Sequence, residues 1–84
     1  MSASVSNTDN VVVEYFDDPD PQHRGNWYVV STGTKVGVWK NYTRMAKYVN
    51  GKRGALYETA PTYDAAMLLY SELKNDGQVE VLPS

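Results

Sequence analysis

Basic and aromatic side chains concentrate in the middle of this 84-residue chain, where together they could hold a polyanion. Residues 27–61 contain six Lys or Arg and one Glu. Residues 1–26 contain five acids and one base, and residues 62–84 contain four acids and one base, so the net charge is −2. Cations interleaved with flat rings suit contact with a phosphate backbone, and the segregation therefore predicts a surface that faces a polyanion. Chance clustering of charges in a short chain is the alternative.

The pair Lys52-Arg53, flanked by Gly51 and Gly54, is the strongest candidate for phosphate contact. Glycines on both sides predict an exposed loop whose backbone can approach a ligand closely. A plain solvent-exposed turn is the alternative explanation. Lys35, next to a predicted hairpin turn, adds one more cation near the strands.

A short predicted helix carries the other candidates. Arg44 and Lys47 lie three residues apart on it, and like charges at that spacing destabilise a helix by a few tenths of a kcal/mol. That penalty indicates a function, although a solvated helix face is the more common explanation. Tyr42 begins the helix, where contact and packing are equally supported, whereas Trp39 and Tyr57 lie on strands and are expected mainly in the core.

Catalysis, metal binding and cofactor binding are not expected. The chain has no cysteine and a single histidine, which leaves neither a thiolate nor a clustered imidazole site. It contains no phosphate-binding glycine loop followed by Lys-Ser/Thr and no nucleophile–base pair. It also has no secretory signal and no apolar run that could span a membrane, so an intracellular location, cytoplasmic or nuclear, is expected.

The elements that must position these residues follow the order β-β-α-β-α. Strands are predicted over residues 27–31, 36–39 and 55–59, with a turn at 32–34 in which Gly33 is available for positive φ. Asn41 is expected to cap a helix that ends near Val49 before Asn50-Gly51, and Thr62 a second helix that ends near Lys74. Gly37, inside the second strand, indicates a bulge or a close backbone approach.

This order predicts a small two-layer α+β domain over residues 27–76, with a three-stranded antiparallel sheet and both helices on one face. Residues 1–26 form an acidic N-terminal extension that is expected to be mostly flexible. Residues 77–84 form a tail or an edge strand. Segments 11–16 and 78–82 are candidate extra edge strands, which could extend the sheet or pair with a second copy in a homodimer.

The middle of the chain resembles the N-terminal hybrid-binding domain of eukaryotic ribonuclease H, which also occurs in the viroplasmin proteins of caulimoviruses. The similarity covers residues 27 to about 70 and rests on an ordered set of short motifs: Tyr28-Val29-Val30, Gly33, Lys35, Gly37-Val38-Trp39, Tyr42, Val49-Asn50-Gly51, Gly54-Ala55-Leu56-Tyr57, Thr62 and Ala65-Ala66. The resemblance implies a three-stranded sheet with two helices and no catalytic activity. It also implies binding of RNA–DNA hybrid, and of double-stranded RNA less tightly.

The resemblance assigns roles to particular positions. Tyr28 and Tyr42 match the aromatic residues that contact the DNA strand, the second of which is usually Trp. Asn50, Gly51 and Gly54 match the loop whose backbone amides meet RNA 2′-hydroxyls, and such contacts can distinguish RNA from DNA.

Several positions depart from the family pattern. Glu58 and Thr59 stand where lysines usually hold phosphates, the hairpin turn keeps only Lys35, and Ala60 replaces an aromatic residue. Each lost cation lowers the contribution of counterion release to affinity. The cations that remain are Lys40, Arg44, Lys47, Lys52 and Arg53.

Two functions fit these observations. The preferred hypothesis is a non-catalytic module that recognises RNA–DNA hybrid or double-stranded RNA through backbone and 2′-OH contacts. The alternative is a protein-interaction or self-associating module that keeps the fold without the ligand. The predicted nucleic-acid-binding residues are Tyr28, Lys35, Tyr42, Arg44, Lys47, Asn50, Gly51, Lys52, Arg53 and Gly54.

Overall fold

The structure, a computed structural model, describes residues 14–83. Its elements follow in the order β1 (Glu14–Phe16), β2 (Trp27–Gly33), β3 (Val36–Trp39), α2 (Tyr42–Ala46), β4 (Leu56–Ala60), α3 (Tyr63–Asn75) and β5 (Glu80–Val81). Residues 1–13 of the predicted N-terminal extension, with the strand prediction for residues 11–13, lie outside this range. The predicted domain bounds, 27–76, stay a prediction.

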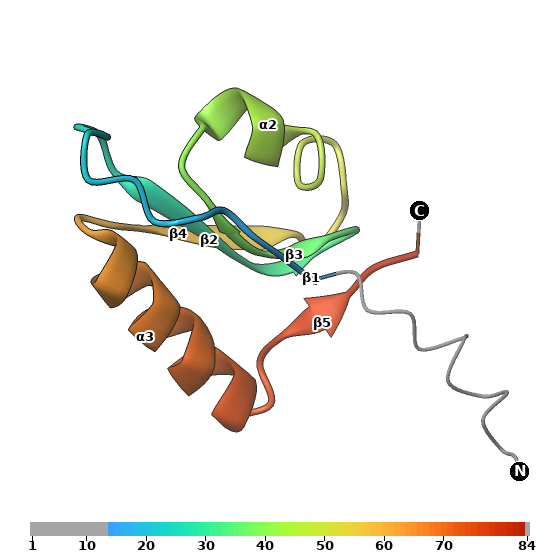
Figure 1. The fold of residues 1–84 in the computed structure, drawn as a ribbon. Coiled ribbons are helices and arrows are strands. Elements are labelled where there is room, and N and C mark those ends of the chain that lie inside the picture. Colours follow the sequence, from blue (N-terminus) through green and yellow to red (C-terminus); the bar gives the residue numbers. More distant parts are fainter. Residues whose placement is uncertain (1–13, 84) are drawn as a thin grey trace, which may run out of the picture.

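The strands form one mixed sheet, and the predicted α+β class is confirmed (Figure 1). Their order is β1-β3-β2-β4, with β5 paired to the far end of β2. The two pairings of the predicted three-stranded core, β2 with β3 and β2 with β4, are antiparallel. β1 and β5 are added in parallel to β3 and β2. Both candidate edge strands therefore extend the sheet of their own chain, the second over Glu80–Val81 rather than the predicted 78–82.

The two helices lie on opposite faces of the sheet, which differs from the prediction that both share one face (Figure 1). Side chains alternate along a strand, and β2 shows which face each helix covers. Tyr28 contacts Tyr42, the first residue of α2, whereas Trp27 contacts Tyr63, the first residue of α3. The sheet is thus covered on both sides, and the two faces carry different chemistry.

The core forms where both faces of the two central strands are buried. Val29, Val30 and Val38 are completely buried, as is Met45, which fixes α2 to the sheet. Tyr70 and Ala66 of α3 are buried on the opposite face. The predicted caps are both present: the Asn41 side chain accepts from the Thr43 amide at 3.0 Å, and the Thr62 side chain accepts from the Ala65 amide at 3.1 Å.

Gly33 differs from the prediction, because it ends β2 and does not adopt positive φ. Crowding explains why residue 33 is a glycine, since a Cβ there would lie 2.8 Å from the Tyr48 carbonyl oxygen. The same carbonyl accepts from the Thr34 amide at 3.1 Å, which joins the hairpin turn to the end of α2. α2 itself is shorter than predicted, and hydrogen-bonded turns replace its last residues.

Side chains also attach the N-terminal strand to the rest of the fold. The carboxylate of Glu14 accepts from Lys74 Nζ at 2.8 Å and from the hydroxyl of Tyr70, both on α3. Further along, Asp17 accepts from the Lys40 amide at 2.8 Å, and Asp20 pairs with Lys40 Nζ at 2.7 Å. Part of the acidic extension is therefore integrated into the sheet and its surroundings.

Candidate nucleic-acid interface

Three tyrosines gather on the face of the sheet that α2 covers. The ring centroids of Tyr28 and Tyr42 are 5.6 Å apart, and Tyr57 lies 6.3 Å from Tyr28 and 6.2 Å from Tyr42. Tyr28 is half-buried, whereas Tyr42 and Tyr57 are 43% and 40% exposed. Because the rings support one another and keep open surface, this tyrosine cluster can stack against sugars or bases.

Tyr57 lies outside the core, so the prediction for this residue is wrong. Its place on a strand predicts a core position for it as for Trp39, but only Trp39 is buried, at 3% exposure. Tyr57 lies opposite Val30 on β4, which is the outermost strand at that end of the sheet, so no further strand covers its ring. The polar residues Glu58 and Thr59, which follow Tyr57 directly, are the sequence signal that could have predicted its exposure.

Strand register separates Glu58 and Thr59, the two positions at which the resemblance implies lysines. Thr59 pairs with Tyr28 and therefore lies beside the tyrosine cluster. Glu58 pairs with Val29, whose side chain faces α3, so its carboxylate lies on the opposite face. The repulsion expected from Glu58 is thus displaced from the tyrosine cluster, and the lost cation on this face is the one at Thr59.

The loop after α2 lies on the same side of the sheet as α2 (Figure 1). Gly51 and Gly54 adopt φ of 71° and 85°, a region that favours glycine, and Lys52 and Arg53 between them are exposed. The Asn50 amide already donates to the Ala46 carbonyl at 2.7 Å. Within residues 14–83, the amides of Gly51 and Gly54 have no such acceptor and are available to a ligand.

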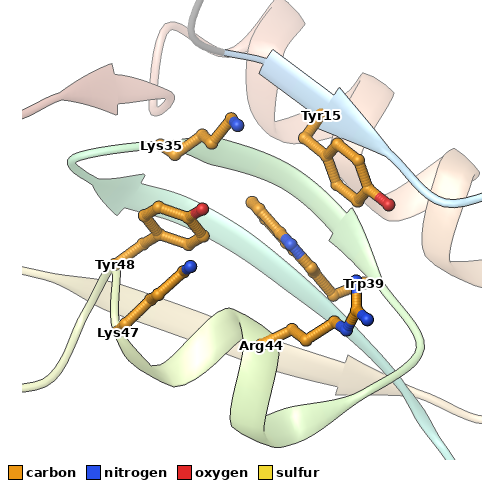
Figure 2. A pocket seen from close by; sticks show the side chains of 6 residues that line it. All are labelled: Tyr15, Lys35, Trp39, Arg44, Lys47 and Tyr48. Carbon is orange, nitrogen blue, oxygen red and sulfur yellow. The ribbon is translucent and has the colours of Figure 1, made fainter.

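A second group of predicted residues lies around Trp39 rather than in the loop. Lys35, Arg44 and Lys47 line a pocket of about 210 Å³ together with Tyr15, Trp39 and Tyr48, which we call the Trp39 pocket (Figure 2). Because Trp39 pairs with Tyr28, the pocket and the tyrosine cluster share one face of the sheet. The predicted cations therefore form two groups, one in the loop and one in this pocket.

Lys40 is engaged by a carboxylate. Its hydrogen bond with Asp20 raises the pKa of Lys40 and lowers that of Asp20. A cation held by a carboxylate contributes less to the attraction of a phosphate, since its charge is already compensated. The remaining cations of this face are Lys35, Arg44, Lys47, Lys52 and Arg53, none of which lies within 4.0 Å of a carboxylate in the described part of the chain.

A comparison with known protein families matches the middle of the chain. Residues 26–68, half of the chain, match the family described as the ribonuclease H1 N-terminal domain. The chain belongs to this family. The matched segment of this ribonuclease H1 N-terminal domain runs from the residue before β2 into α3, and thus contains the tyrosine cluster and the loop. β1, with Tyr15 of the Trp39 pocket, precedes it.

No curated protein and no solved structure gives a significant match to the chain. The family is a non-catalytic domain of ribonuclease H. Over residues 14–83, no three His, Asp or Glu side chains come together as metal ligands would. The helices of that same range are all too short or too polar to cross a membrane.

Proposed function

We propose that this domain binds RNA–DNA hybrid, and double-stranded RNA less tightly, as a non-catalytic module. The tyrosine cluster is the observation that carries this proposal, because it places Tyr28 and Tyr42, which match the family's DNA-contacting aromatics, beside an exposed third ring. Rings with open surface in contact with one another provide a platform for sugars and bases, and mutual packing limits the entropy lost on binding.

The loop after α2 supplies the second type of contact. Gly51 and Gly54 offer amides that have no acceptor among residues 14–83, and the exposed Lys52 and Arg53 between them provide charge. Amides that donate to 2′-hydroxyls would identify the RNA strand, while tyrosines pack on the other strand. Two unlike strands would thus be read by two different parts of one face, which favours a hybrid over double-stranded DNA.

Fluorescence anisotropy with a labelled RNA–DNA hybrid at low salt tests the proposal. The wild-type chain should bind the hybrid more tightly than double-stranded RNA, and double-stranded DNA least. Tyr42→Ala and Tyr57→Ala should each weaken hybrid binding about tenfold, since loss of a stacked ring costs about 1–3 kcal/mol. Phe16→Ala is the matched control, because it removes a 37% exposed ring that packs against Tyr70 on the α3 side.

Two results would contradict the proposal. One is the absence of hybrid binding at tens of micromolar in a protein whose circular dichroism shows it folded. The other is an equal loss for the Phe16 variant and the two tyrosine variants, which would indicate a general effect on stability.

Self-association is a second candidate function, favoured by the outer edge of β4. This strand is at the end of the sheet among the described residues, and Leu56 on it is 62% exposed. An open, apolar strand edge can pair with another chain. Light scattering at increasing concentration tests this candidate: a dimer that Leu56→Lys dissociates supports it, and a strict monomer eliminates it.

A further inference from the structure

The Trp39 pocket has an aromatic floor. Trp39 lies between Tyr15 and Tyr48, with centroid separations of 5.3 and 5.5 Å and interplanar angles of 30° and 34°. These three rings come from β3, from β1 and from the turn after α2, so the floor forms only when all three segments are in place (Figure 2).

Three cationic groups surround this floor. Lys35 Nζ lies 5.5 Å from the centroids of both Tyr15 and Tyr48, and Lys47 Nζ lies 5.2 Å from that of Tyr48. Both amino groups thus approach the same tyrosine ring, while Arg44 extends from α2 along Trp39 (Figure 2). Cation–π contacts hold these side chains over the rings without neutralising their charge.

The carboxylate of Asp17, which lies beside Tyr15, is not paired with any of these cations. Asp17 accepts from the Tyr15 hydroxyl with one carboxylate oxygen and from the Lys40 amide with the other. In the part of the chain that the structure describes, neither of the two ion pairs involves a cation of the pocket. Three like charges around one hollow repel one another, and an anion that enters the hollow would relieve this repulsion.

We infer that the Trp39 pocket binds the terminal phosphate monoester of a nucleic-acid strand. A phosphate monoester carries about 1.5 to 2 negative charges at neutral pH and presents three acceptor oxygens, whereas an internal phosphodiester carries one charge. Three cations that line one pocket suit the monoester, since charge-assisted hydrogen bonds are the strongest that a side chain can make. The inference rests on the proposed function, because the pocket adjoins the tyrosine cluster through the Tyr28–Trp39 pair of β2 and β3.

Short blunt hybrids that differ only at their ends test the inference. We expect the full chain to bind a hybrid with a 5′- or a 3′-terminal phosphate about tenfold more tightly than the same hybrid with hydroxyl ends. Lys35→Met and Lys47→Met should abolish this preference. Arg24→Met, which removes one charge outside the pocket, should keep it, and Tyr42→Ala should weaken all forms equally.

Experiments with free phosphates distinguish a phosphate at a strand end from a free mononucleotide or inorganic phosphate as the ligand of the pocket. The two tryptophans occupy opposite faces, so the indole N–H resonance of Trp39 should shift when adenosine monophosphate or inorganic phosphate is added, and that of Trp27 should not. Adenosine monophosphate should also compete with the phosphorylated hybrid. Thermal denaturation confirms that the Met variants are folded.

Each further outcome is decisive. Equal affinity for phosphorylated and hydroxyl ends, in a protein that binds hybrid, overturns the inference and leaves the proposed function intact. A Trp39 shift with adenosine monophosphate but no hybrid binding overturns the strand end as the source and identifies a mononucleotide site. An end preference that survives Lys35→Met and Lys47→Met also overturns it, because the phosphate must then bind elsewhere. If an acidic peptide shifts the Trp39 indole resonance and the phosphates do not, the pocket does not bind phosphate and the inference is overturned.

Discussion

Gly37 of β3 lies against the backbone of Tyr15 in β1, so closely that a Cβ on Gly37 would fall 1.8 Å from the Tyr15 carbonyl oxygen. Gly37 also adopts φ of 139°, which L side chains rarely adopt. The close approach anticipated from a glycine inside a strand is therefore confirmed. It is this contact that allows the N-terminal strand, which precedes the matched family segment, to join the sheet and bring Tyr15 to Trp39.

Gly37→Ala should consequently lower the free energy of unfolding by about 3 kcal/mol, because the strained φ and the overlap with Tyr15 act together. Urea denaturation followed by circular dichroism measures the change. Gly25→Ala is the matched control: its Cβ would lie 3.6 Å from the His23 ring, an ordinary contact, and the change should be within about 0.5 kcal/mol. Similar losses in both variants would show that the proximity of Gly37 and Tyr15 is not what stabilises the sheet.

Glu14 should make part of the stability depend on pH. Its hydrogen bonds with Lys74 and then Tyr70 hold the pKa of the Glu14 carboxyl below its ordinary value of 4.5. A carboxyl with a lowered folded-state pKa stabilises fully above its unfolded value, and this contribution disappears as the pH falls through the folded value. Glu14→Gln should therefore destabilise by about 1 kcal/mol at neutral pH and much less at about pH 3.

Urea titrations of the wild-type chain and the Glu14→Gln variant, from neutral pH to about pH 3, measure this difference in the free energy of unfolding. Glu72→Gln removes a carboxylate from the exposed surface of α3 and should change the free energy of unfolding by less than about 0.5 kcal/mol throughout. A Glu14 variant that loses equal stability at both ends of the range would contradict the linkage.

Thr59→Lys should strengthen hybrid binding. Thr59 lies beside Tyr28 on the face with the tyrosine cluster, so a lysine there can add a phosphate contact and its counterion release. We expect a gain of several-fold at low salt that diminishes as salt rises. Glu58→Gln removes a negative charge from the opposite face and should have little effect, as anisotropy titrations can show. If the two variants gained equally, overall charge rather than the register of β4 would control affinity.

Lys52 and Arg53 should determine the salt dependence of binding. Each residue that contacts a phosphate contributes about 1 to the slope of log affinity against log salt. Lys52→Ala with Arg53→Ala should therefore lower the slope by about 2, together with a loss of affinity for every duplex tested. The measurement is an anisotropy titration at several salt concentrations, with Arg24→Ala as the control that should keep the slope. An unchanged slope in the double variant would remove this loop from the interface.

Local signals in the sequence predicted the elements well. Asn41 and Thr62 each precede a helix and cap it, because capping depends on a side chain and the amides two or three residues further on. The predicted strands 27–31, 36–39 and 55–59 agree with β2, β3 and β4 within one or two residues. The family segment could also be identified, since it rests on spacings along the chain.

The tertiary structure alone decided which residues meet. Which face of the sheet each helix covers depends on how the connections before and after it cross the sheet. The residues of α2 and α3 do not determine this by themselves. Tyr57 is exposed because β4 ends the sheet, a property of strand order rather than of the strand. Likewise, Tyr15 reaches Trp39 only because β1 pairs in parallel with β3, a contact between segments more than twenty residues apart. Sequence determined the local conformation, and long-range pairing determined the surfaces that a ligand can meet.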